Sequence, residues 1–146
     1  MATVDILCVV DAKSLVEKYP SATSASTRQT LTHADIHPYA RMVTHDGQAM
    51  SNHASDDLVV RAHPGDIIRW RAISITDDKE SKIAVGGFTS VNTQLYTQPV
   101  HIPSLDLWQS SAIAVGSDTY WVNFNATYEG TTCYFWWDPG INISLP

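Results

Sequence analysis

The sequence has few basic residues and no long apolar segment, and these two absences narrow what the chain can do. Nine Lys and Arg residues stand against fifteen Asp and Glu residues, for a formal net charge of -6. Binding to nucleic acid or to an anionic membrane surface selects clustered Lys and Arg, so neither partner is expected. The apolar run at residues 6–10 is too short for a membrane span or for the core of a signal peptide. We therefore expect a cytoplasmic protein, either held in inclusions or released without a signal peptide.

Motifs for metal centres and for nucleophilic catalysis are also missing. Cys133 has no His or Met after it, which excludes the ligand order of a blue-copper site. The chain contains no His-Glu-x-x-His, Cys-x-x-Cys or Gly-x-Ser-x-Gly motif. His33 and His37 are four residues apart, but Pro38 argues against a helix there, so both are interpreted as loop or surface histidines. We expect no stoichiometric transition metal and no catalytic residues.

Cysteine is scarce as well. Cys8 and Cys133 are the two cysteines of the chain, and each lies inside an apolar, strand-like run. Free cysteine is among the most frequently buried residue types, which favours two buried thiols. A disulfide between them is the alternative.

Residues 58–62 and 67–73 form the most informative pattern that is present. In the first segment apolar residues alternate with others, which is the period of a half-buried strand. Pro64 and Gly65 have the conformational preferences of a tight turn, and the chain then returns to a strand containing Trp70. The pattern predicts two antiparallel strands joined by this turn, with Trp70 buried beneath the sheet.

The remaining segments indicate an all-β fold. Residues 4–10 predict a central strand, and Asp11 is placed to cap a short helix over residues 12–19 that ends at Pro20. Further short strands follow, separated by turn residues, and 44% of the residues are hydrophobic. We expect a single domain over residues 1–146, an antiparallel β-sandwich with one short helix near the N-terminus.

An acidic turn is a candidate cation site. Asp77, Asp78 and Glu80 bring several carboxylate oxygens into one loop. Calcium prefers oxygen ligands but needs six or more of them, so the turn supplies only part of a site. A solvated charged turn is the alternative to a calcium site.

Aromatic residues are concentrated near the C-terminus. On the strand predicted at residues 131–137, Tyr134 and Trp136 share one face and Trp137 lies on the other. An exposed aromatic face suits stacking on sugar rings, and Trp136, Trp137 and Asp138 form a candidate ligand patch. The alternative is that a second sheet or a second subunit covers both faces. The aromatic excess and the edge strands favour a homo-oligomer.

Three stretches of the chain together resemble the AidA/PixA family of bacterial inclusion-body proteins. The first is residues 5–12 (DILCVVDA), followed by Leu15 and Lys18-Tyr19-Pro20. The second is Asp57-Leu58 with Ala62, Gly65-Asp66 and residues 68–71 (IRWR). The third is residues 134–139 (YFWWDP) with Ile141 and Ile143. The resemblance implies a small bacterial protein, often controlled by quorum sensing and associated with host interaction, virulence or cytoplasmic inclusions. It implies no reaction and no catalytic residues.

These observations lead to two hypotheses for function. The first is a non-enzymatic accessory protein that acts by ligand binding, with carbohydrate as the first ligand class to test. The second is a structural or storage protein that self-associates in cytoplasmic inclusions. An enzyme comes third.

Overall fold

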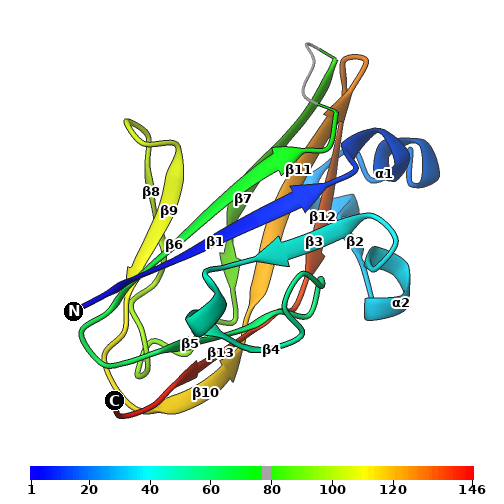
Figure 1. The fold of residues 1–146 in the computed structure, drawn as a ribbon. Helices are drawn as coiled ribbons and strands as arrows, with labels where there is room; N and C mark the ends of the chain where they lie inside the picture. Colours follow the sequence, from blue (N-terminus) through cyan, green and yellow to red (C-terminus); the bar gives the residue numbers. More distant parts are fainter. Residues whose placement is uncertain (77–79) are drawn as a thin grey trace.

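The computed structural model describes residues 1–76 and 80–146, which form three β-sheets with short helices at one end (Figure 1). The strands are β1 (Thr3–Val10), β2 (Gln29–Thr30), β3 (Ala40–Val43), β4 (Ala49–Ser51), β5 (Val59–Ala62), β6 (Ile67–Ser74), β7 (Ser81–Thr89), β8 (Val100–Ile102), β9 (Leu107–Ser111), β10 (Gly116–Thr119), β11 (Trp121–Tyr128), β12 (Thr131–Trp137) and β13 (Gly140–Ile143). The helices are α1 (Ala12–Lys18) and α2 (His33–Ile36), with 3-10 turns η1 (Ala25–Thr27) and η2 (Asp46–Gln48).

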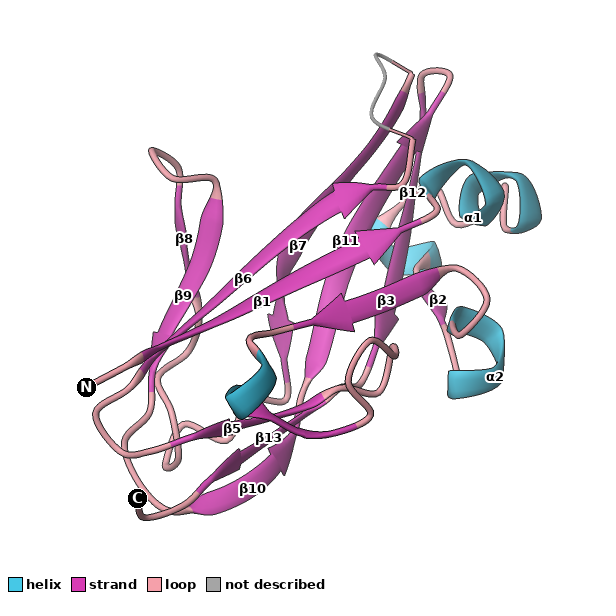
Figure 2. Ribbon diagram, in the orientation of Figure 1, coloured by secondary structure: helices cyan, strands magenta, loops and turns pink. Residues whose placement is uncertain are grey.

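The strands are distributed over three separate sheets. The first sheet has the order β3-β1-β6-β9-β8, the second β10-β13-β5-β4, and the third β2-β12-β11-β7. Both α1 and α2 lie at the end of the molecule opposite the β8–β9 hairpin (Figure 2). The expected β-rich fold is thus confirmed.

The N-terminal segment folds as its sequence predicts. Alternate residues of β1 are buried, and β1 lies between β3 and β6 in the first sheet. The Asp11 carboxylate accepts a hydrogen bond from the Ser14 backbone N–H at 3.1 Å and so caps α1. The helix ends at Lys18, two residues before Pro20.

The core contains a group of packed aromatic side chains around Trp70. Trp70 is fully buried, as predicted, and its indole N–H donates to the Tyr120 hydroxyl at 2.9 Å. Phe88 lies 4.8 Å from the Trp70 ring centroid. Aromatic rings of this size bury a large apolar area, and the hydrogen bond satisfies the indole N–H inside the core.

The sheets are mixed, which corrects the expectation of a purely antiparallel sandwich. β1 pairs in parallel with β6, β13 with β5, and β12 with β2. Parallel neighbours require a long connection between the paired strands, and local alternation of apolar residues cannot reveal such a pairing. A second helix, α2, is also present besides the one expected.

The turn at Pro64 and Gly65 corrects a second expectation. Gly65 has a φ of 95° and the turn is present, but β5 and β6 belong to different sheets and do not pair with each other. The turn is therefore a corner of the sandwich. Asp66 holds it, because its carboxylate accepts hydrogen bonds from the backbone N–H groups of Ala2 and His63, each at 2.8 Å.

Both cysteines are free and buried, which confirms the prediction of two separate thiols. Burial raises the pKa of Cys8 to about 12 and also raises the pKa of Cys133. Since the thiolate is the reactive form, neither cysteine is set up as a nucleophile.

Within residues 1–76 and 80–146, no helix has the length and apolar character that crossing a membrane requires.

Replacement of Asp66 by Ala should lower the free energy of unfolding by about 1–3 kcal/mol, because two backbone N–H groups would lose their acceptor in a buried corner. Urea denaturation followed by tryptophan fluorescence measures this loss. The exposed Asp46 provides a control, and Asp46→Ala should change stability by less than about 0.5 kcal/mol. Equal stability of the two variants would contradict the role given to Asp66.

Candidate functional site

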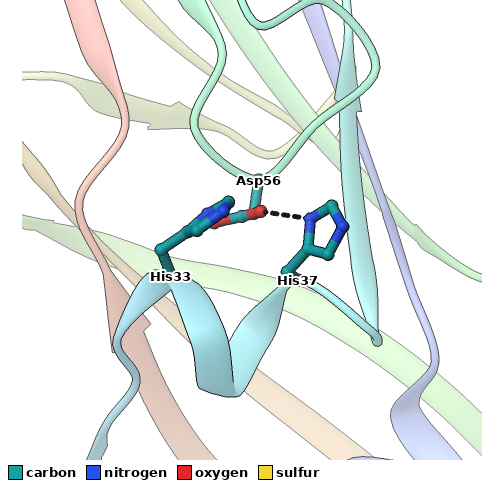
Figure 3. Close-up of side chains that lie close together, drawn as sticks. All are labelled: His33, His37 and Asp56. Carbon is teal, nitrogen blue, oxygen red and sulfur yellow. Dashed lines mark hydrogen bonds and ion pairs between the residues drawn. The ribbon is translucent and has the colours of Figure 1, made fainter.

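Three side chains from two distant parts of the sequence meet at one surface site. The Nδ1 atoms of His33 and His37 face the carboxylate of Asp56 from two sides (Figure 3). His33 Nδ1 lies 2.9 Å from Asp56 Oδ2, and His37 Nδ1 lies 3.2 Å from Asp56 Oδ1. One candidate ligand atom from each residue can be chosen so that all lie within 4.8 Å of one another. This grouping is the His–Asp site.

The helix α2 brings the two histidines together, which corrects the expectation that no helix forms there. Thr32 and Asp35 form a capping box, with the Asp35 carboxylate accepting from the Thr32 backbone N–H at 3.1 Å. The His37 backbone N–H donates to the His33 carbonyl at 2.9 Å, so one turn separates the two rings. Pro38 follows directly after the C-cap residue His37, where it ends the helix without preventing it.

Asp56 is held in a buried position just before β5. Its side chain is 1% exposed, while those of His33 and His37 are 56% and 51% exposed. The Asp56 backbone carbonyl accepts a hydrogen bond from the buried Trp137 indole at 3.2 Å. Asp57 extends the site, since its Oδ2 atom lies 3.2 Å from His33 Nδ1.

The electrostatics of the site follow from its carboxylates. The hydrogen bond to Asp56 raises the pKa of His33, with a further contribution from the charge of the same carboxylate. Burial raises the pKa of Asp138, and the negative charges of Asp57 and Asp56 add to that effect. Three carboxyl groups, those of Asp56, Asp57 and Asp138, thus lie near the two histidines.

The predicted ligand patch adjoins the His–Asp site. Trp136 is half-buried, and its indole donates to the Thr30 hydroxyl at 2.5 Å. Trp137 is 1% exposed and stacks on Phe124 with ring centroids 4.0 Å apart, so its ring is not available to a ligand. Asp138 is half-buried, and it lies close enough to Asp57 and Asp56 for their negative charges to affect its pKa.

The outer face of the third sheet carries aromatic and amide side chains. Trp121 and Trp136 lie with ring centroids 5.5 Å apart, and the Arg28 guanidinium lies 5.3 Å from the Trp136 ring centroid. Asn123 is opposite Trp136 in the β11–β12 register. Its Oδ1 atom is buried and has no hydrogen-bond partner among residues 1–76 and 80–146. We call Trp121, Asn123, Tyr134 and Trp136 the aromatic face.

The predicted calcium turn falls mostly outside the described residues. Asp77 and Asp78 are not among them. Glu80 is described and exposed, and its backbone carbonyl accepts from the Glu129 backbone N–H at 2.9 Å. A calcium site at this turn stays a prediction.

Asp56 lies 19 positions after His37, so no local pattern in the sequence predicts the His–Asp site. One local signal was available. Thr32 and Asp35 have the spacing of a capping box, which predicts a helix start directly before His33. The helix would have placed the two histidines on one side, but nothing in the sequence identifies Asp56 as their partner.

Replacement of Trp137 by Phe should lower the free energy of unfolding by about 1–3 kcal/mol, since the Asp56 carbonyl would lose a buried donor while the stacking on Phe124 is retained. The matched control is Trp136→Phe, which removes an indole hydrogen bond at an exposed position and should cost about 1 kcal/mol or less. Denaturant unfolding of both variants measures the difference. An equal loss in both would mean that the Trp137 bond has no special weight.

Comparisons with known proteins identify the family. A model of the PixA inclusion body protein family matches residues 2–106 of the 146. A crystal structure of an inclusion body protein (PixA) from Burkholderia cenocepacia J2315 has a TM-score of 0.79 and 17% sequence identity, covering 98% of this chain and 95% of that chain. At this identity the likeness shows a shared fold. A comparison with curated proteins found no match. The family match spans most of the chain, and the protein therefore belongs to the PixA inclusion body protein family.

Proposed function

We propose that the protein acts by self-association, with copies packing through the outer face of the first sheet, as the storage or structural material of an inclusion. Membership of an inclusion body protein family supports assembly of many copies. The observation that carries the proposal is a group of apolar side chains on that outer face. They are Leu7, Val9, Val43, Ile73 and Ile75, and we call this group the apolar face.

The strand register places these side chains side by side. Leu7 is opposite Val43 in the β1–β3 pair, and Val9 is opposite Ile73 in the β1–β6 pair. Paired residues point to the same side of a sheet, so these side chains form a diagonal apolar strip. Arg71, opposite Leu7, and Arg41, opposite Val9, border it. Ile73 and Ile75 are 49% and 62% exposed. Parallel strands are usually covered on both faces, which makes exposure of apolar residues on the β1–β6 pair unusual.

The surroundings of the apolar face suit a second copy of the same chain. A groove of about 460 Å³ is lined by residues that include Leu7 and Val43, together with Asp5 and Arg71. The presence of both charge signs at one groove allows a two-fold related copy to pair them reciprocally. Contiguous exposed apolar surface is a common mark of protein–protein contact.

Replacement of Ile73 and Ile75 together by Lys should weaken self-association at least tenfold. The change removes apolar burial of about 1 kcal/mol per side chain and places two charges at the contact. Sedimentation velocity over a range of micromolar concentrations gives the association constant. Both side chains are exposed, so the variant should keep the circular dichroism spectrum of the parent.

The control is Val115→Lys, which introduces the same charge at a residue that is 54% exposed and lies directly before β10 of the second sheet. This variant should associate like the parent. A parent that is monomeric at high micromolar concentration would refute the proposal. Equal association of the double variant would refute the choice of face.

A second candidate function, carbohydrate binding, is favoured by the aromatic face. Indole rings pack against the apolar faces of sugars, and Trp121 and Trp136 lie side by side on this face with ring centroids 5.5 Å apart. In this hypothesis Asp138, and a calcium ion held by Asp77, Asp78 and Glu80, would bind the hydroxyl groups of the sugar. Trp136 would supply the stacking surface.

A glycan array with the parent protein, in calcium and in chelator, should show signals that Trp136→Ala reduces at least tenfold, because the stacking ring is lost. Thr132→Ala is the control, since Thr132 lies on the same side of β12 without an aromatic ring. An array without signals in both conditions would remove carbohydrate as the ligand class. Quorum-sensing control of expression, which the family resemblance implies, stays a prediction.

A further inference from the structure

The His–Asp site has the donor spacing of a metal centre before any ion is bound. Two ligand atoms about 2.1 Å from a tetrahedral metal ion lie about 3.4 Å apart. The Nδ1–Oδ distances from Asp56 to His33 and His37 are 2.9 and 3.2 Å. Each of these two distances is within about 0.5 Å of the tetrahedral value, and the candidate ligand atoms of the three residues lie within 4.8 Å of one another.

A cation bound at this point would compensate the buried carboxylate of Asp56. A buried carboxylate is costly unless positive charge or hydrogen bonds compensate it. Across residues 1–76 and 80–146, the ion-pair partners of Asp56 are His33 and His37, and the Ser55 hydroxyl adds a hydrogen bond at 3.3 Å.

An ion can reach the site and complete its shell there. Both histidine side chains are about half exposed, so the site opens to solvent. Asp57 Oδ2, 3.2 Å from His33 Nδ1 and on a side chain 39% exposed, is placed to supply a fourth ligand. Water can fill any remaining position.

We infer that His33, His37 and Asp56, with Asp57 as the fourth donor, bind a divalent transition-metal ion such as Zn²⁺. Two imidazole nitrogens favour zinc, cobalt, nickel or copper over calcium and magnesium, which select oxygen ligands. The ion would join α2 to the segment before β5, two parts of the chain that are separated in sequence. This inference is independent of the proposed self-association and of carbohydrate binding.

The test uses the full chain after treatment with a chelator and dialysis. Calorimetric titration with ZnCl₂ should give one ion per chain, and Co²⁺ should develop the visible absorption of a low-coordinate nitrogen and oxygen site. A hundredfold excess of Zn²⁺ over the dissociation constant should raise the midpoint of thermal unfolding by roughly 5–10 °C. An excess of CaCl₂ should not displace Co²⁺ from the site, so it should leave the visible absorption unchanged.

Substitutions at the proposed ligands test which residues bind the Zn²⁺ ion. The double variant His33→Gln and His37→Gln should bind Zn²⁺ at least a hundredfold more weakly, and its exposed positions make it a folded protein with the parent's circular dichroism spectrum. Asp56→Asn provides a second test from the other segment. His101→Gln is the control, because His101 also has a carboxylate neighbour, Asp106 at 3.7 Å, but lies outside the site.

Three results would overturn the inference. The first is a parent protein with no saturable Zn²⁺ binding. The second is a double variant that binds as tightly as the parent. The third is displacement of bound Co²⁺ by an equal concentration of Ca²⁺. None of these results would bear on the sedimentation experiment, so failure of the metal site and failure of self-association can be told apart.

Discussion

The parallel pairing of β1 with β6 is the constraint on which the rest of the fold depends. β1 ends at Val10 and β6 begins at Ile67, and both run in the same direction. A parallel pair cannot be closed by a tight turn, so the chain between them must travel back along the molecule. That connection forms α1, β2, α2, β3, β4 and β5, and its strands join all three sheets. The His–Asp site lies within it, on α2 and on the segment before β5 (Figures 1 and 3).

The sequence predicts local structure well and strand partners poorly. The Asp11 cap, the interior strand β1 and the alternation of buried residues in β12 each depend on near neighbours, and all three are confirmed. The turn at Pro64 and Gly65 has the composition of a hairpin, yet it forms a corner between sheets. Hairpins and corners use the same turn residues, because both need a sharp change of direction. Which strand pairs with the next is decided by distant contacts, such as that of Asp66 with Ala2.

The same distinction explains the candidate site. Two histidines four residues apart carry little information by themselves, and α2 is too short to show a helical period. Their partner Asp56 is identified only when the crossover connection folds. Trp136 and Trp137 are adjacent in sequence, but one lies toward solvent and the other holds the Asp56 backbone in place. The strand period predicts that their faces differ, while the structure assigns the buried role to Trp137.

The burial of both thiols has a consequence for contacts between copies of the chain. Cys8 and Cys133, the two cysteines of the chain, have no exposed surface. Exposed thiols on closely packed copies would form disulfides between molecules once the surroundings became oxidising. With both thiols inside the sandwich, contacts between folded copies remain non-covalent. Folded copies that meet at high concentration are therefore not cross-linked through cysteine when the surroundings become oxidising.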